Sequence, residues 1–158
     1  VTVGPIRAQA SDVLDLLSDP TRCQVLLVTL PEETPVNEVV ETAFKLEDQV
    51  GVHLAPIVVN GLYPSLPLTE DPAAAATAAG VRLTSAELDA LRTAAAFRQD
   101  RQRLQEEQVR RLADALPLPQ LHLPFLFTTD VGRAEVDELA GMLAIEIENL
   151  PAPAQTRS

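Results

Sequence analysis

An amide, one thiol and two imidazoles are the side chains with the clearest potential for chemistry. Asn60 ends the apolar run that begins at Ile57, and Gly61 follows it. An amide donates and accepts hydrogen bonds at once, which matches the N6/N7 edge of adenine. The local sequence alone favours a simpler interpretation, since Asn-Gly is a frequent turn pair. Both interpretations place Asn60 at the carboxyl end of a strand, where open α/β sheets bind ligands.

The thiol and the imidazoles do not form a recognisable reactive set. Cys23 opens an apolar run with no pair of histidines near it, so we interpret it as a structural thiol. His53 and His122 also lie in apolar contexts and lack partners at zinc-ligand spacing, which indicates buried or strand-edge histidines. The residues contain neither a G-x-x-x-x-G-K-[ST] loop nor a G-x-G-x-x-G fingerprint. A self-contained nucleoside triphosphatase is therefore excluded on this sequence.

The elements that must position these residues alternate between strands and helices. The apolar run Cys23–Leu30 predicts a strand buried on both faces, followed by strands over 53–59 and from Gln120 to Leu123. Helical patterns occupy residues 5–17, 34–50, 84–115 and 136–150, and the alanine-rich stretch 73–80 is a short helix or a mobile segment. This order predicts an α/β fold: part of a doubly wound parallel sheet, with about three strands and flanking helices in three layers.

Two helix starts are predicted from their capping residues. Thr34 is a candidate N-cap with Pro35 just inside the helix, and Gly51 would end that helix. Thr84 and Glu87 fit a capping box for the long helix. The middle of the long helix, residues 97–108, is polar nearly all round. We favour a solvated face held by intrahelical charge pairs there, with a partner surface as the alternative.

Composition limits the function classes. The 158 residues carry a net charge of −11, which argues against non-specific binding to nucleic acid or to an anionic membrane. Hydrophobic residues make up 46% of the chain, enough for one core, so we expect a domain over 1–150 and a disordered tail over 151–158.

No apolar run is long enough for a membrane span, and the single Cys suits a reducing cytoplasm. The first residue is Val1 and not Met, which suggests a fragment of a longer polypeptide.

Several motifs occur together in the order of a known family. They are Ser18-Asp-Pro20 before a strand, the helix opening Pro31–Glu38, the strand end Ile57–Asn60, and Leu121-His-Leu-Pro124 after a long helix; Gly4–Gln9 adds a lead-in segment. Together they resemble the carboxyl-terminal portion of the ArsA-type ATPases. That family includes the arsenite-pump ATPase, the targeting ATPase for tail-anchored membrane proteins and shorter actinobacterial anion-transporting ATPases. The resemblance extends to about Leu150.

The resemblance implies a P-loop NTPase-like sheet and a dimer that binds and hydrolyses ATP with Mg²⁺. In this chain Asn60 would hydrogen-bond the adenine, and Pro124, Phe125 and Leu126 would begin the loop that closes over the base. Glu38 matches an acidic residue near the nucleotide interface of the dimer. The family's phosphate loop, switches and Mg²⁺ ligands would lie upstream of this chain.

The resemblance predicts the base-binding portion of an ATPase, enzymatic as the intact polypeptide and inactive as these 158 residues alone. It implies a homo-oligomer or a paired ATPase subunit and does not identify the client. Residues 62–97 lack the C-x-x-C pair of the targeting members, which argues against a zinc-bridged dimer. The alternative function is a catalytically dead interaction module that uses the polar helix 98–111. Substitution of Asn60 would distinguish the two, because only the first function needs its amide.

Overall fold

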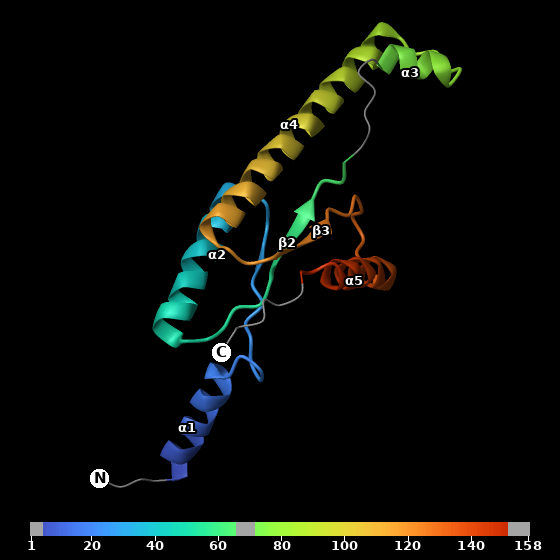
Figure 1. Ribbon diagram of the computed structural model, residues 1–158. Coiled ribbons are helices and arrows are strands. Elements are labelled where there is room, and N and C mark those ends of the chain that lie inside the picture. The colour runs from blue at the N-terminus through green and yellow to red at the C-terminus, as the bar shows by residue number, and fades with distance from the viewer. Residues whose placement is uncertain (1–4, 66–71, 152–158) are drawn as a thin grey trace.

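A three-stranded parallel sheet forms the centre of the molecule. The computed structural model describes residues 5–65 and 72–151 of the chain. The strands are β1 (Val28–Thr29), β2 (Ile57–Leu62) and β3 (Gln120–Pro124), in the spatial order β1-β2-β3 (Figure 1). Val28 pairs with Val58, and Val58 pairs with Leu121. The predicted α/β fold with a parallel sheet of about three strands and flanking helices is confirmed.

Helices cover both faces of this sheet. The described helices are α1 (Pro5–Ser18), α2 (Glu33–Lys45), α3 (Pro72–Ala78), α4 (Ser85–Ala115) and α5 (Arg133–Glu148). The helices α2 and α4 lie on one face, α5 lies on the other, and the α3 end of α4 extends beyond the strands (Figure 1). No helix among the described residues is long and apolar enough to cross a membrane.

The two faces have separate apolar cores. The core beneath α2 and α4 contains Val36, Val39, Ala43, Ile57, Val59, Leu112 and Leu116. The core beneath α5 contains Val58, Leu121 and Leu123, with Leu139 and Met142 packed against it. Successive β2 side chains enter opposite cores, as the two-residue period of a strand requires. Burial on both faces is therefore a property of β2.

The first predicted strand is shorter and less buried than the sequence suggests. β1 has regular ladder pairing only at Val28–Thr29, with an isolated parallel bridge from Val25 to Leu54. Leu26, Val28 and Leu30 are 50%, 59% and 44% exposed, so the prediction of burial on both faces is wrong. Val28 shares a face with its partner Val58, but α5 packs on β2 and β3 and leaves Val28 uncovered.

The second strand is shifted along the chain relative to its prediction. β2 runs from Ile57 to Leu62, so Asn60 and Gly61 belong to the strand, beyond its predicted end at residue 59. Residue 54, within the predicted strand, forms only an isolated bridge. Pro56 cannot donate a ladder hydrogen bond, which is consistent with regular pairing starting directly after it.

The α2 start also differs from its prediction. The N-cap is Glu32, α2 begins at Glu33, and the Thr34 side chain does not cap it. A π-helical turn over Leu46–Val50 continues α2, and Gly51 ends it with a left-handed φ of 73°, as predicted. The alanine-rich stretch is helical, as α3. The tail predicted after Pro151 lies outside the described residues.

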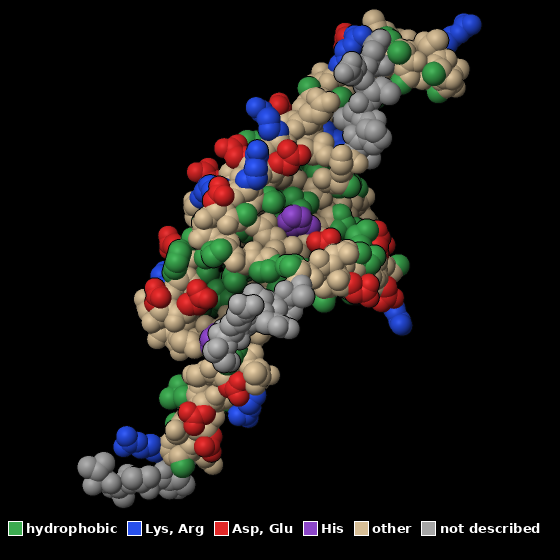
Figure 2. Space-filling model, viewed as in Figure 1, with side chains coloured by type: hydrophobic (Ala, Val, Ile, Leu, Met, Phe, Trp, Pro, Cys, Tyr) green, Lys and Arg blue, Asp and Glu red, His purple; other side chains and the backbone are tan. Residues whose placement is uncertain are grey.

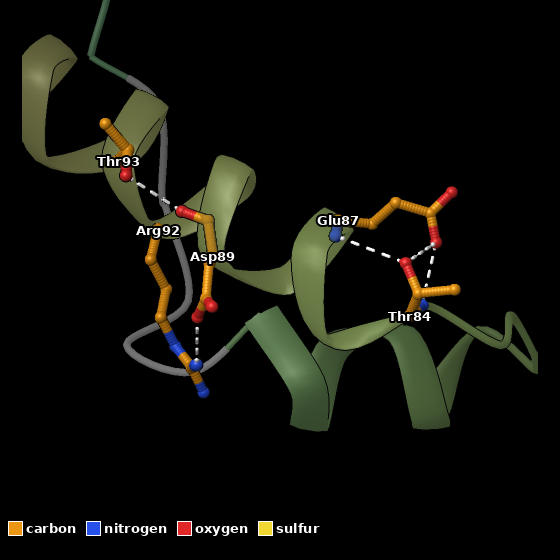
Figure 3. A network of polar contacts seen from close by, with 5 residues as sticks. All are labelled: Thr84, Glu87, Asp89, Arg92 and Thr93. Atoms are coloured by element: carbon orange, nitrogen blue, oxygen red, sulfur yellow. Dashed lines mark hydrogen bonds and ion pairs between the residues drawn. The ribbon is translucent and has the colours of Figure 1, made fainter.

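The capping box of α4 is confirmed. The backbone N–H of Glu87 donates to Thr84 Oγ1 at 3.3 Å, and the N–H of Thr84 donates to Glu87 Oε2 at 2.7 Å (Figure 3). One turn later Arg92 pairs with Asp89 at 3.3 Å (Figure 3). The hydrogen bonds from the Thr84 backbone and hydroxyl lower the pKa of Glu87, since they favour its ionised form. This end of α4 is thus fixed by local sequence.

Candidate functional site

Asn60 lies in an irregular part of β2. The pairing of β2 with β3 shifts between Val59 and Leu62, and Gly61 has a φ of 83°. A left-handed residue beside a register shift is the geometry of a β-bulge, which bends a strand and redirects a side chain. The Asn-Gly pair therefore forms a bulge inside the strand, and the interpretation as a chain-reversing turn is wrong.

A groove of about 340 Å³ contains both Asn60 and Glu38 in its lining. Its walls are residues 27–30 of the β1 region and the α2 residues Pro35, Glu38, Val39 and Thr42. Asn60 is half-buried, and within the described residues no hydrogen bond to its side chain is recorded. The volume falls in the range of ~300–1,000 Å³ typical of small-molecule sites. The groove thus combines partly apolar walls and the Glu38 carboxyl with an amide free to donate and accept.

The predicted loop after β3 lies next to Gly61 and Leu62 in space. The Phe125 N–H donates to the carbonyl of Leu62 at 2.7 Å, so this loop continues the pairing along β2. A Cβ atom on Gly61 would lie 3.6 Å from Leu30 Cδ2 and 4.0 Å from Phe125 Cδ2. Gly61 is therefore flanked by a side chain from the β1 end and one from the β3 end.

The members of the predicted set do not all line one cavity. Pro124 borders a second cavity, on the α5 side, together with Tyr63 and Glu146. Phe125 is 43% exposed and Leu126 is partly buried. The structure thus brings Asn60 and Glu38 into one groove, places Phe125 beside Gly61, and directs Pro124 to the opposite side.

An aromatic cluster that was not predicted from the sequence includes Phe125, the neighbour of Gly61. The rings of Tyr63, Phe125 and Phe127 lie 4.9–5.3 Å apart between centroids. The Arg98 guanidinium lies 4.9 Å from the Phe127 centroid and 5.5 Å from that of Tyr63, within cation–π range. Figure 2 shows hydrophobic side chains gathered between α4 and α5, with acidic and basic side chains interspersed along α4.

Buried Gln105 was also missed. It is 5% exposed, its Oε1 accepts from the Tyr63 N–H at 2.8 Å, and its Nε2 donates to the Gly61 carbonyl at 3.0 Å. Arg98 and Gln102 both donate to the Pro64 carbonyl, at 2.9 and 3.2 Å. The spacing of 98, 102 and 105 places them on one helical face, and this was the available sequence signal.

The polar middle of α4 thus serves two purposes. Arg103 pairs with Asp100 within the helix at 3.1 Å, as predicted for a solvated face. Arg101 instead contacts Glu32 at the start of α2 at 3.4 Å. The interpretation as a face held only by intrahelical pairs is therefore incomplete. An interaction module based on residues 98–111 stays a prediction.

The histidines and the cysteine lie apart from the groove lining. His53 is exposed and Cys23 is partly buried. His122 is exposed on the edge strand β3, where its N–H donates to Glu146 Oε2 at 2.9 Å. Within residues 5–65 and 72–151, no group of three His, Cys, Asp or Glu side chains could hold a metal ion.

Comparison with known proteins gives a partial relationship. No protein-family model matches the chain. Over 53 residues the chain is 38% identical to an arsenical pump-driving ATPase of Halobacterium salinarum. The match covers 34% of this chain and only 8% of that relative. It supports a relationship to the ArsA-type ATPases at most.

Proposed function

We propose that this chain is the base-binding portion of an ArsA-like ATPase. Asn60 would accept a hydrogen bond from adenine N6 and donate one to N7, the pairing that an amide makes with this base edge. The observation that carries the proposal is the half-buried Asn60 beside the β2 bulge, lining an apolar groove with no described side-chain partner. The partial similarity to an arsenical pump-driving ATPase supports it independently.

The aromatic side chains near Gly61 suit a planar base. Phe125 is 43% exposed and approaches Gly61, and Tyr63 packs against it at 5.3 Å. Stacking of a base on an aromatic ring contributes ~1–3 kcal/mol and tolerates any base. We therefore assign selection of adenine to Asn60, and closure over the base to the segment Pro124–Leu126.

The sheet edges support a larger sheet in the intact protein. At the β3 edge, the outward N–H of His122 is satisfied by Glu146 of α5. At the β1 edge, three apolar side chains on one face stay exposed: Leu26, Val28 and Leu30. Exposed apolar strands at an unpaired edge favour pairing with a further strand. A continuation of the sheet past β1, with a helix over that face, would bury these side chains.

Phosphoryl transfer in that larger protein would depend on groups outside this chain. The sequence has no phosphate-binding loop, so the triphosphate and Mg²⁺ would be held elsewhere in the polypeptide. This portion would orient the nucleotide through its base. Glu38, exposed on the groove wall, would face the second subunit of a dimer. The client stays unassigned.

Nucleotide titration of the purified chain tests the proposal. We expect adenosine and ATP to shift the backbone amide resonances of Asn60 and Phe125, and Asn60→Ala to weaken the response to both. Asn37→Ala is the matched control, since Asn37 is an exposed asparagine of α2 that does not line the groove. Equal responses from Asn60→Ala and Asn37→Ala would contradict the assignment of adenine recognition to Asn60.

The same preparation tests inactivity of the isolated portion. Without a phosphate-binding loop we expect no steady release of phosphate from ATP. Release above the buffer rate, at a level that follows protein concentration through purification, would contradict this.

A further inference from the structure

The strand segment that carries Asn60 is held by one buried side chain from a distant helix. Gln105 of α4 lies 44 residues from Gly61 in the chain, and it uses both ends of its amide on the backbone of Gly61 and Tyr63. These are the two residues on either side of Leu62. The side chain is 5% exposed, so water does not compete freely for these bonds.

The neighbouring backbone groups are also satisfied, and from other elements. The Leu62 carbonyl accepts from the Phe125 N–H, and the Pro64 carbonyl accepts from Arg98 and Gln102. Among these contacts, only that of Gln105 reaches Gly61, the residue after Asn60. Gly61 has a left-handed φ and no side chain, so local sequence does little to fix its conformation.

We propose that Gln105 is a positioning residue that sets the preference of this site for adenine over guanine. This inference rests on the proposed function of Asn60. By fixing the Gly61 carbonyl and the Tyr63 N–H, Gln105 holds the bulge in the geometry that turns Asn60 into the groove. Apolar and aromatic contacts with a base do not depend on this geometry, whereas two directed hydrogen bonds to one base edge do.

The discriminating quantity is the ratio of the Kd for GTP to the Kd for ATP. Gln105→Met keeps the approximate volume and removes both hydrogen bonds, so we expect the ratio to fall about ten- to hundredfold. The affinity for GTP should stay nearly constant. If Gln105 had a purely structural role, its replacement would lower the folded fraction of the chain and weaken the binding of ATP and GTP equally. Gln105→Glu keeps an acceptor for Tyr63 and loses the donor to Gly61, so we expect an intermediate ratio.

Gln102→Met is the matched control. Gln102 lies on the same face of α4 but bonds to Pro64, farther along the chain from Asn60, so its removal should leave the ratio unchanged. Circular dichroism identifies folded variants, and Gln105→Glu supplies the test if Gln105→Met does not fold.

The outcomes separate this inference from the proposed function. A wild-type chain that binds ATP and GTP equally overturns the proposed function and this inference with it. A wild-type chain that prefers ATP, beside folded Gln105 variants with the same ratio, overturns only this inference. A ratio that falls equally in Gln102→Met also overturns it, because the effect would then belong to α4 in general.

Discussion

Replacing Val28 and Val58 one at a time by alanine tests how far the sheet is covered. The two valines are register partners on the same face, so they differ mainly in what lies above them. Val58 is 4% exposed beneath α5, whereas Val28 is 59% exposed. Val28 lies on an edge strand and Val58 on the central strand, so the difference between the two variants reports side-chain packing and burial.

The expected magnitudes follow from these exposed fractions. Removing two fully buried methyl groups costs about 1.6 kcal/mol in transfer free energy, and a residual cavity adds to it. Val58→Ala should therefore lower the free energy of unfolding by about 2 kcal/mol. Val28→Ala should cost about 1–2 kcal/mol less, because more than half of its side chain already contacts water.

Urea denaturation of both variants provides the assay, with unchanged m-values as the check that the compared states are the same. Equal losses of unfolding free energy in the two variants of the isolated chain would contradict the exposure of Val28 on β1. In a longer polypeptide whose sheet continues past β1, the loss for Val28→Ala should rise to that for Val58→Ala.

Two further substitutions test local features. Gly61→Ala places a Cβ at a φ of 83° and should destabilise the fold by about 1–2 kcal/mol. Gly141→Ala lies inside α5, where a Cβ meets nothing within 4 Å, and should stabilise the fold slightly. Thermal melts that rank the two variants in the reverse order would contradict the left-handed conformation of Gly61 in the bulge. Glu87→Ala should lower the melting temperature at neutral pH. Because folding lowers the pKa of Glu87, its contribution is complete above the unfolded pKa and is lost as pH falls through the folded pKa. The difference in melting temperature between wild-type and Glu87→Ala should therefore vanish in acid. A difference independent of pH would show that the ionised Glu87 carboxylate does not stabilise the helix start.

Local sequence patterns predicted the elements that depend on local physics. The capping box at Thr84, the left-handed end at Gly51 and the apolar β2 all follow from residues within a few positions of one another. The partial exposure of Val28 could not be predicted in this way. It depends on the reach of α5, an element more than 100 residues later in the chain.

The sequence predicted Asn60, the central residue of the candidate site, but not the side chain that holds its strand segment. The apolar run ending in Asn60 indicated a strand, but the Asn-Gly pair on its own favoured a turn. The bulge is supported by Gln105 of α4, whose side chain hydrogen-bonds the backbone of Gly61 and Tyr63. Nothing in the residues next to Asn60 indicates this contact.

Binding of ATP and GTP to the wild-type chain and to Asn60→Ala tests directly whether Asn60 selects adenine. We expect the wild-type chain to prefer ATP and Asn60→Ala to lose about ten- to hundredfold of this preference, since the amide is the proposed reader of the base. The Asn37→Ala control should keep the wild-type ratio. A wild-type chain that binds ATP and GTP equally, or an Asn60→Ala variant that retains the preference for ATP, would show that Asn60 does not select adenine.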